Sequence, residues 1–106
     1  MFQFRNQCLE RSLVIVVFVV PFAPPCDAVL TDLQRLQRTL ENLDVAKIDC
    51  ASPKGSTLAD THGIEATPTL RFFVGGKQVH SMTTISLDLV HPFVVKWSKK
   101  ALALRQ

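Results

Sequence analysis

One stretch of the chain, residues 45–79, decides the fold, and it runs VAKIDCASPKGSTLADTHGIEATPTLRFFVGGKQV. Its second half contains two segments with strand-like composition, Thr69–Val74 and Lys77–Met82, separated by the pair Gly75-Gly76. Such a pair is typical of a two-residue hairpin turn, because both turn positions need positive φ angles. This half therefore predicts two antiparallel strands joined by a tight turn.

The first half of the stretch predicts a strand followed by a helix. Val45–Cys50 is short and largely apolar, as in a strand. Residues 52–56 have the composition of a loop. Thr57–His62 is expected to form a short helix that ends at Gly63, where a left-handed backbone conformation is common.

Upstream lie an apolar segment and a long amphipathic helix. Leu13–Val20 is rich in valine and isoleucine, which favours a central strand buried on both faces. Pro21 ends it, and a helix is expected from Cys26 onward, with Pro24 and Pro25 in its first turn. The apolar face of this helix recurs mostly at three- and four-residue steps, and comprises Val29, Leu30, Leu33, Leu36, Leu40 and Leu43. Its opposite face comprises Asp32, Arg35, Arg38 and Glu41.

Each end of the chain adds a predicted helix. Gln3–Arg11 carries apolar residues at helical spacing, and Ser86–Leu104 is amphipathic with an interruption or kink near Pro92. The elements then follow the order α β α β α β β α in one domain covering residues 1–106. This order predicts an α/β fold in three layers, whose central mixed sheet combines a parallel βαβ unit with a C-terminal hairpin and is flanked by helices.

Residues 1–28 have a second interpretation, as a secretory signal peptide. Arg5 and Arg11 precede the apolar run Leu13–Val20, and a stretch of small residues ends near Ala28. The run is too short to span a bilayer. Because it is rich in valine rather than leucine, the strand interpretation is favoured.

Composition excludes several classes of function. The 106 residues carry a formal net charge of +3, with basic residues scattered rather than interleaved with aromatics, so nucleic-acid binding is not expected. Three cysteines without a CxxC pair do not suggest a disulfide-stapled secreted domain. His62, His80 and His91 are not at metal-ligand spacing with any of them. We expect no metal, no cofactor and no membrane span.

The combination of Asp49-Cys50, Leu58–Ile64, Thr67–Phe73 and Gly75–Lys77 resembles thioredoxin and protein disulfide isomerase domains. The first half agrees in layout, since a strand is followed by Pro21–Cys26 and a long helix. The likeness covers roughly residues 2–104 and implies a thioredoxin-like fold.

The resemblance also shows what this chain lacks. The attacking cysteine of the family's motif falls on Ala23, and its partner cysteine falls on Cys26, which leaves a degenerate Ala-Pro-Pro-Cys motif. Disulfide exchange needs one thiolate to attack and a second thiol to resolve the mixed disulfide. The family's buried acid falls on Val17, and Asp27 places a negative charge where the family usually has lysine. These departures predict weak or absent redox chemistry.

Pro68 matches the family's cis-proline, with Thr67 before it. By resemblance, these two residues together with Phe22, Pro24 and Pro25 would form a shallow, partly apolar groove for an extended peptide. The alternative is that Pro68 only shapes the fold.

Cys50 and Cys8 are expected to be buried thiols, although a Cys8–Cys26 or Cys26–Cys50 disulfide stays open. Two functions follow. The first is a redox-inactive domain that binds a polypeptide or protein partner; the alternative is a monothiol oxidoreductase that uses Cys26. Resemblance to disulfide isomerases points to the endoplasmic reticulum lumen or secretory pathway, and resemblance to thioredoxin points to the cytoplasm.

Overall fold

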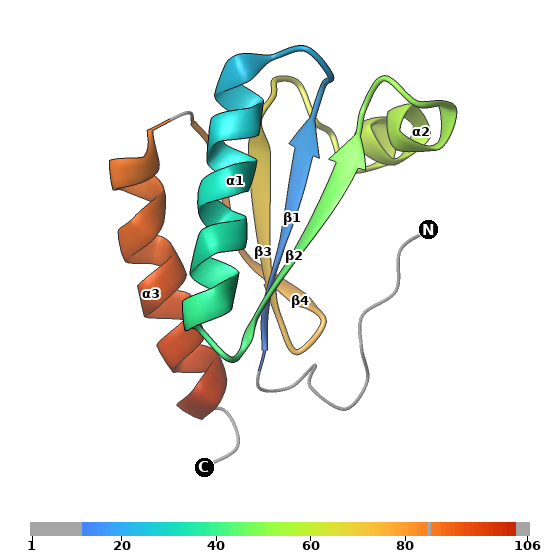
Figure 1. Ribbon diagram of the computed structural model, residues 1–106. Helices are drawn as coiled ribbons and strands as arrows, with labels where there is room; N and C mark the ends of the chain where they lie inside the picture. Colours follow the sequence, from blue (N-terminus) through green and yellow to red (C-terminus); the bar gives the residue numbers. More distant parts are fainter. Residues whose placement is uncertain (1–11, 85, 104–106) are drawn as a thin grey trace.

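The computed structural model describes residues 12–84 and 86–103. In this part of the chain, four strands form one sheet in the order β2-β1-β3-β4, and helices cover both of its faces (Figure 1). The expected α/β fold with a mixed sheet is confirmed. The first predicted helix, Gln3–Arg11, lies outside the described residues. The elements are β1 (Leu13–Val19), α1 (Pro24–Thr39), β2 (Leu43–Asp49), α2 (Pro53–Thr61), β3 (Thr69–Val74), β4 (Lys77–Thr83) and α3 (Leu87–Ala103).

Strand β1 lies inside the sheet, where it pairs in parallel with β2 and antiparallel with β3. All seven of its residues are buried. Alternate side chains of a strand point to opposite faces, so β1 supplies two separate cores. Leu13, Ile15, Val17 and Val19 enter one core, and Val14, Val16 and Phe18 enter the other. The unbroken apolar run therefore has a physical reason: neither face of β1 meets water.

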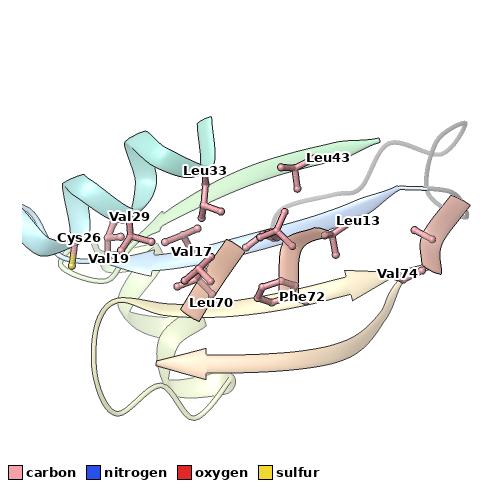
Figure 2. Close-up of a cluster of buried hydrophobic side chains, with 14 residues drawn as sticks. Leu13, Val17, Val19, Cys26, Val29, Leu33, Leu43, Leu70, Phe72 and Val74 are labelled. Carbon is pink, nitrogen blue, oxygen red and sulfur yellow. The ribbon is translucent and has the colours of Figure 1, made fainter. Parts of the chain in front are cut away.

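The larger core lies between the sheet and helices α1 and α3 (Figure 2). Val29 and Leu33 from α1, and Val90 and Val94 from α3, are completely buried there. Full burial of such a side chain contributes about 1.5–3 kcal/mol. Helix α2 covers the opposite face through Ala59, which packs in the smaller core. The pair Phe72 and Phe73 divides between the two cores, as expected for neighbours on a strand covered on both sides.

Helix α1 begins with Pro24 and Pro25 in its first turn, as predicted, but it ends earlier than the apolar pattern predicts. It spans Pro24–Thr39, with Leu40 as its C-cap. Leu43 belongs to β2 rather than to the helix, so the prediction was wrong at this point. No glycine or proline marks the boundary, and a leucine at helical spacing can equally begin a strand.

Helix α2 was predicted to begin at Thr57, after a loop over residues 52–56, and this boundary was wrong. The helix begins at Pro53, and the Ser52 hydroxyl accepts a hydrogen bond from the Gly55 N–H at 3.0 Å. Serine is a favoured N-cap residue, and proline suits the first helical position because its missing N–H would have no partner there. Serine and proline are also common in loops, which is why composition alone misplaced the start.

The hairpin agrees with expectation, whereas the interruption expected near Pro92 in the last helix does not occur. Gly75 and Gly76 have φ angles of 61° and 80°, as a two-residue turn between twisted strands requires. Helix α3 is continuous from Leu87 to Ala103 and contains Pro92 in its interior, so no break occurs at the proline. Pro92 costs this helix one backbone hydrogen bond in its second turn.

Gly55 is required where α2 meets the end of β2. A Cβ atom at this position would lie 1.7 Å from the backbone oxygen of Asp49, whereas one at Gly63 would meet no atom within 4 Å. We expect Gly55→Ala to lower the free energy of unfolding by about 2–3 kcal/mol, since the helix must move away from the strand. Gly63→Ala is the control, because it costs only the positive φ of 67°, about 1 kcal/mol. Urea unfolding of the two variants measures the difference, and equal losses would contradict the close approach of α2 to β2.

Candidate functional site

The turn that leads from β1 into α1 presents apolar groups to solvent. Phe22 has a φ angle of 62°, which non-glycine residues seldom adopt, and its side chain is 97% exposed. Ala23 is the helix N-cap and offers no capping side chain. Pro24 and Pro25 follow in the first helical turn, and both are exposed. This turn therefore displays one aromatic ring and two proline rings.

Cys26 lies below this turn and faces the protein interior. Its backbone N–H donates to the Ala23 carbonyl at 2.9 Å, which starts the helical hydrogen-bond pattern. The side chain is only 2% exposed and packs in the larger core with Val17 and Val19 (Figure 2). The thiol is free. A thiolate must reach its target to attack, so Cys26 in this position is shielded from a protein disulfide.

Val17 is completely buried in the same core as Cys26. Its side chain can neither accept nor donate a proton. The acidic side chain nearest in sequence, Asp27, is exposed on the first turn of α1. Among the described residues, the surroundings of the Cys26 side chain are those of a packed apolar core rather than those of an acid–base pair.

The loop before β3 reaches the same end of the sheet. Thr69 is opposite Phe18 in the β1–β3 register, so Thr67 and Pro68 lie beside the end of β1 from which the Phe22 turn departs. The Thr67–Pro68 peptide bond is cis, Pro68 is buried and Thr67 is half-buried. The sheet thus brings the two predicted groups of site residues to one end.

Two side chains of β3 hold this loop in place. The Thr69 hydroxyl donates to the Ala66 carbonyl at 2.6 Å and contacts the Thr83 hydroxyl at 2.9 Å. The Arg71 guanidinium donates to the His62 carbonyl at 2.9 Å. The backbone of Thr67 itself makes no hydrogen bond within residues 12–84 and 86–103.

Cys50 is half-buried just beyond β2, and its thiol is also free. Its backbone N–H donates to the Val19 carbonyl at 2.8 Å. Burial raises the pKa of the Cys50 thiol, and the neighbouring Asp49 carboxylate and Cys26 raise it further. At neutral pH Cys50 is therefore a neutral thiol and a poor nucleophile. The Cys26–Cys50 disulfide left open by the sequence is not formed, and Cys8 lies outside the described residues.

One polar pair was missed by the sequence interpretation. Asp32 was placed on the solvent face of its helix, but it is only 8% exposed and hydrogen-bonds His91 of α3. Arg35 lies 3.7 Å from the same carboxylate. The pair joins the two helices on one side of the sheet. The contact spans 59 positions of sequence, so helical periodicity carries no sign of it.

The other histidines contact aromatic rings. The His62 ring lies 5.8 Å from Phe18, and the His80 ring stacks on Phe93 at 4.3 Å. Within the described residues, no three histidine, cysteine or acidic side chains come together as metal ligands would. In the same part of the chain, no helix combines the length and apolar character needed to cross a membrane.

Comparisons with known proteins agree on the family. The thioredoxin family model matches residues 2–90. A protein disulfide-isomerase of Humicola insolens is 32% identical over 96 residues, which is 89% of this chain and 16% of that protein. Protein disulfide-isomerase 1 of Dictyostelium discoideum is 32% identical over 79 residues, which is 71% of this chain and 21% of that protein. The chain thus spans less than a quarter of the length of either relative.

Solved structures show the same fold at lower identity. A thioredoxin of Fasciola hepatica superposes with a TM-score of 0.75 at 20% identity, over 86% of this chain and 85% of that one. Thioredoxin f2 of Chlamydomonas reinhardtii gives a TM-score of 0.72 at 22% identity, over 83% of each chain. Since the family model covers most of the sequence and the architecture agrees, the chain belongs to the thioredoxin family.

Proposed function

We propose that this thioredoxin-like domain binds a polypeptide segment without exchanging disulfides. One observation carries the proposal: the N-cap residue before α1 is Ala23, which has no thiol, and the thiol of Cys26 in the first helical turn is only 2% exposed. A domain with this geometry keeps the exposed turn of the family's site, while among the described residues its two thiols, Cys26 and Cys50, are buried and half-buried. Binding can then persist where covalent chemistry cannot.

Two kinds of contact support peptide binding at this end of the sheet. The backbone N–H and carbonyl of Thr67, which have no hydrogen-bond partner among the described residues, can pair with an extended peptide, as in strand addition to a sheet edge. The rings of Phe22, Pro24 and Pro25 offer apolar area for its side chains. A ring that is 97% exposed in the free protein gains most from being covered by a partner.

The alternative, a monothiol oxidoreductase that uses Cys26, meets an obstacle in the packing. Its sulfur would have to leave the core that it shares with Val29 and Leu70 before it could form a mixed disulfide. Cys50, whose pKa is raised, is no better placed as a nucleophile. The domain is therefore proposed as a binding module rather than an enzyme.

We also propose where in the cell the domain is located. The disulfide-isomerase relatives support the endoplasmic reticulum lumen or secretory pathway, and the thioredoxin neighbours leave the cytoplasm as the alternative.

Cleavage near Ala28 would remove β1, which pairs with both β2 and β3. We therefore propose that residues 12–28 stay in the functional domain.

An insulin-reduction assay with dithiothreitol tests the loss of redox activity. We expect the parent chain not to accelerate insulin precipitation above the dithiothreitol blank, because Cys26 is buried and Cys50 is half-buried. Ala23→Cys should accelerate it, since the new thiol would lie at the half-buried N-cap, one helical turn from Cys26. Ala28→Cys is the control, because it adds an exposed thiol away from the N-cap position 23. Acceleration by the parent chain would refute the redox-inactive proposal.

Fluorescence anisotropy with a labelled, unstructured peptide of alternating apolar and polar residues tests the binding surface. Phe22→Ala should weaken binding about 5- to 30-fold, as for an aromatic residue near the centre of an interface. Leu89→Ala, which removes a 57% exposed side chain from α3, should leave the affinity unchanged. If the two variants bind alike, the peptide does not use the turn before α1.

A further inference from the structure

A pocket lies at the opposite end of the sheet from Cys26, between the β3–β4 hairpin and the last turns of α3. We call it the Trp97 pocket. Figure 2 shows Cys26 and Val74 at the two ends of the larger core, and Val74 marks the end at which this pocket opens. Its volume is about 460 Å³, within the range of small-molecule sites. It is lined by Val74, Lys77, Val79, Trp97, Lys100 and Ala103.

A bulge in strand β4 contributes an apolar side chain to the floor of the pocket. Phe72 pairs with His80 and Phe73 pairs with Gln78, so Val79 is an extra residue in a β-bulge. The side chains of Val79 and of Trp97, which belongs to α3, both pack against the larger core. Above it, Ala103 is too short to fill the space between the helix and the hairpin. A ligand inside would therefore meet mainly hydrocarbon and the indole ring.

The mouth of the pocket is positively charged. Lys77 of the hairpin and Lys100 of α3 both line the pocket. The ammonium groups of Lys100 and of the neighbouring Lys96 each lie 5.4 Å from the centre of the Trp97 ring. In residues 12–84 and 86–103, the ion pairs are those of Asp32 with Arg35 and His91. No described carboxylate therefore neutralises these lysines. The buried indole N–H of Trp97 also has no hydrogen-bond partner among the described residues.

We propose that the Trp97 pocket binds a small amphipathic carboxylate, a straight-chain fatty acid of medium length. Its alkyl chain lies against Val79 and Trp97, and its carboxylate lies between the ammonium groups of Lys77 and Lys100. A polar ligand would lose hydration on entering the apolar floor, and a cation would be repelled at the mouth. An apolar chain that ends in a negative charge satisfies both parts. The site does not depend on the proposed peptide surface, because the two lie at opposite ends of the sheet.

The protein carries its own probe for this pocket. Trp97 is the only tryptophan, and the chain contains no tyrosine, so emission excited at 295 nm comes from the pocket itself. Titration with decanoate, below the concentration at which it forms micelles, should change this emission saturably. Burial of each methylene should strengthen binding about fourfold, so octanoate should bind about 15-fold more weakly than decanoate. An emission change that does not saturate would overturn the proposal.

Charge and shape are tested separately. Lys77→Gln and Lys100→Gln should each weaken decanoate binding about threefold, and decanol should bind more weakly than decanoate. Lys54→Gln, a lysine on α2, is the matched control and should have no effect. Ala103→Leu fills the pocket from an exposed helical position and should abolish binding while the far-ultraviolet circular dichroism stays unchanged.

Either of two outcomes would overturn the proposed fatty-acid site. Equal affinities for decanol and decanoate would show that the lysines select nothing. Loss of decanoate binding in Phe22→Ala, with Ala103→Leu unaffected, would place the fatty acid at the other end of the sheet. Decanoate binding that is normal in Phe22→Ala and lost in Ala103→Leu would support the pocket.

Discussion

The architecture depends on the double burial of β1. This strand hydrogen-bonds to β2 on one edge and β3 on the other, and its side chains enter a separate core on each face. Removing it would separate β2 from β3 and leave both cores without their central side chains. Because the hydrophobic contribution scales with the apolar area buried, no other element of the described chain contributes to so many parts of the fold.

The candidate site is a consequence of where β1 ends. The turn after β1 places Phe22 at the surface, and Cys26 in the first turn of α1 packs in the same core as Val17 and Val19 of β1. The antiparallel register with β3 brings Thr67 and Pro68 to the same end. Under the proposed function, this geometry serves binding rather than disulfide exchange.

Local patterns predicted the central strand, the hairpin turn and the buried face of α1 well. The apolar run of β1, the Gly75-Gly76 turn and the helical spacing of Val29 and Leu33 each depend on physics within a few residues, and each was recovered. The boundaries were harder. Leu43 satisfies both a helical and a strand pattern, and the Ser52-Pro53 start of α2 has the composition of a loop.

Contacts distant in sequence could not be predicted. The Asp32–His91 pair and the pocket beside Trp97 arise only when α1, α3 and the hairpin pack together. For the site, resemblance to the family named Ala23, Cys26 and Pro68 as candidate residues. It could not supply the 2% exposure of the thiol, which depends on how the core closes around it.

Amide hydrogen exchange, resolved to single residues in the intact chain, tests the central role of β1 most directly. The amides of residues 14–19 should exchange only through global unfolding, with an opening free energy equal to the unfolding free energy measured in urea. Amides of the edge strand β4 should open at lower cost. Exchange of β1 at a clearly lower free energy than β3 would contradict this account, since the strand would then be peripheral to the fold.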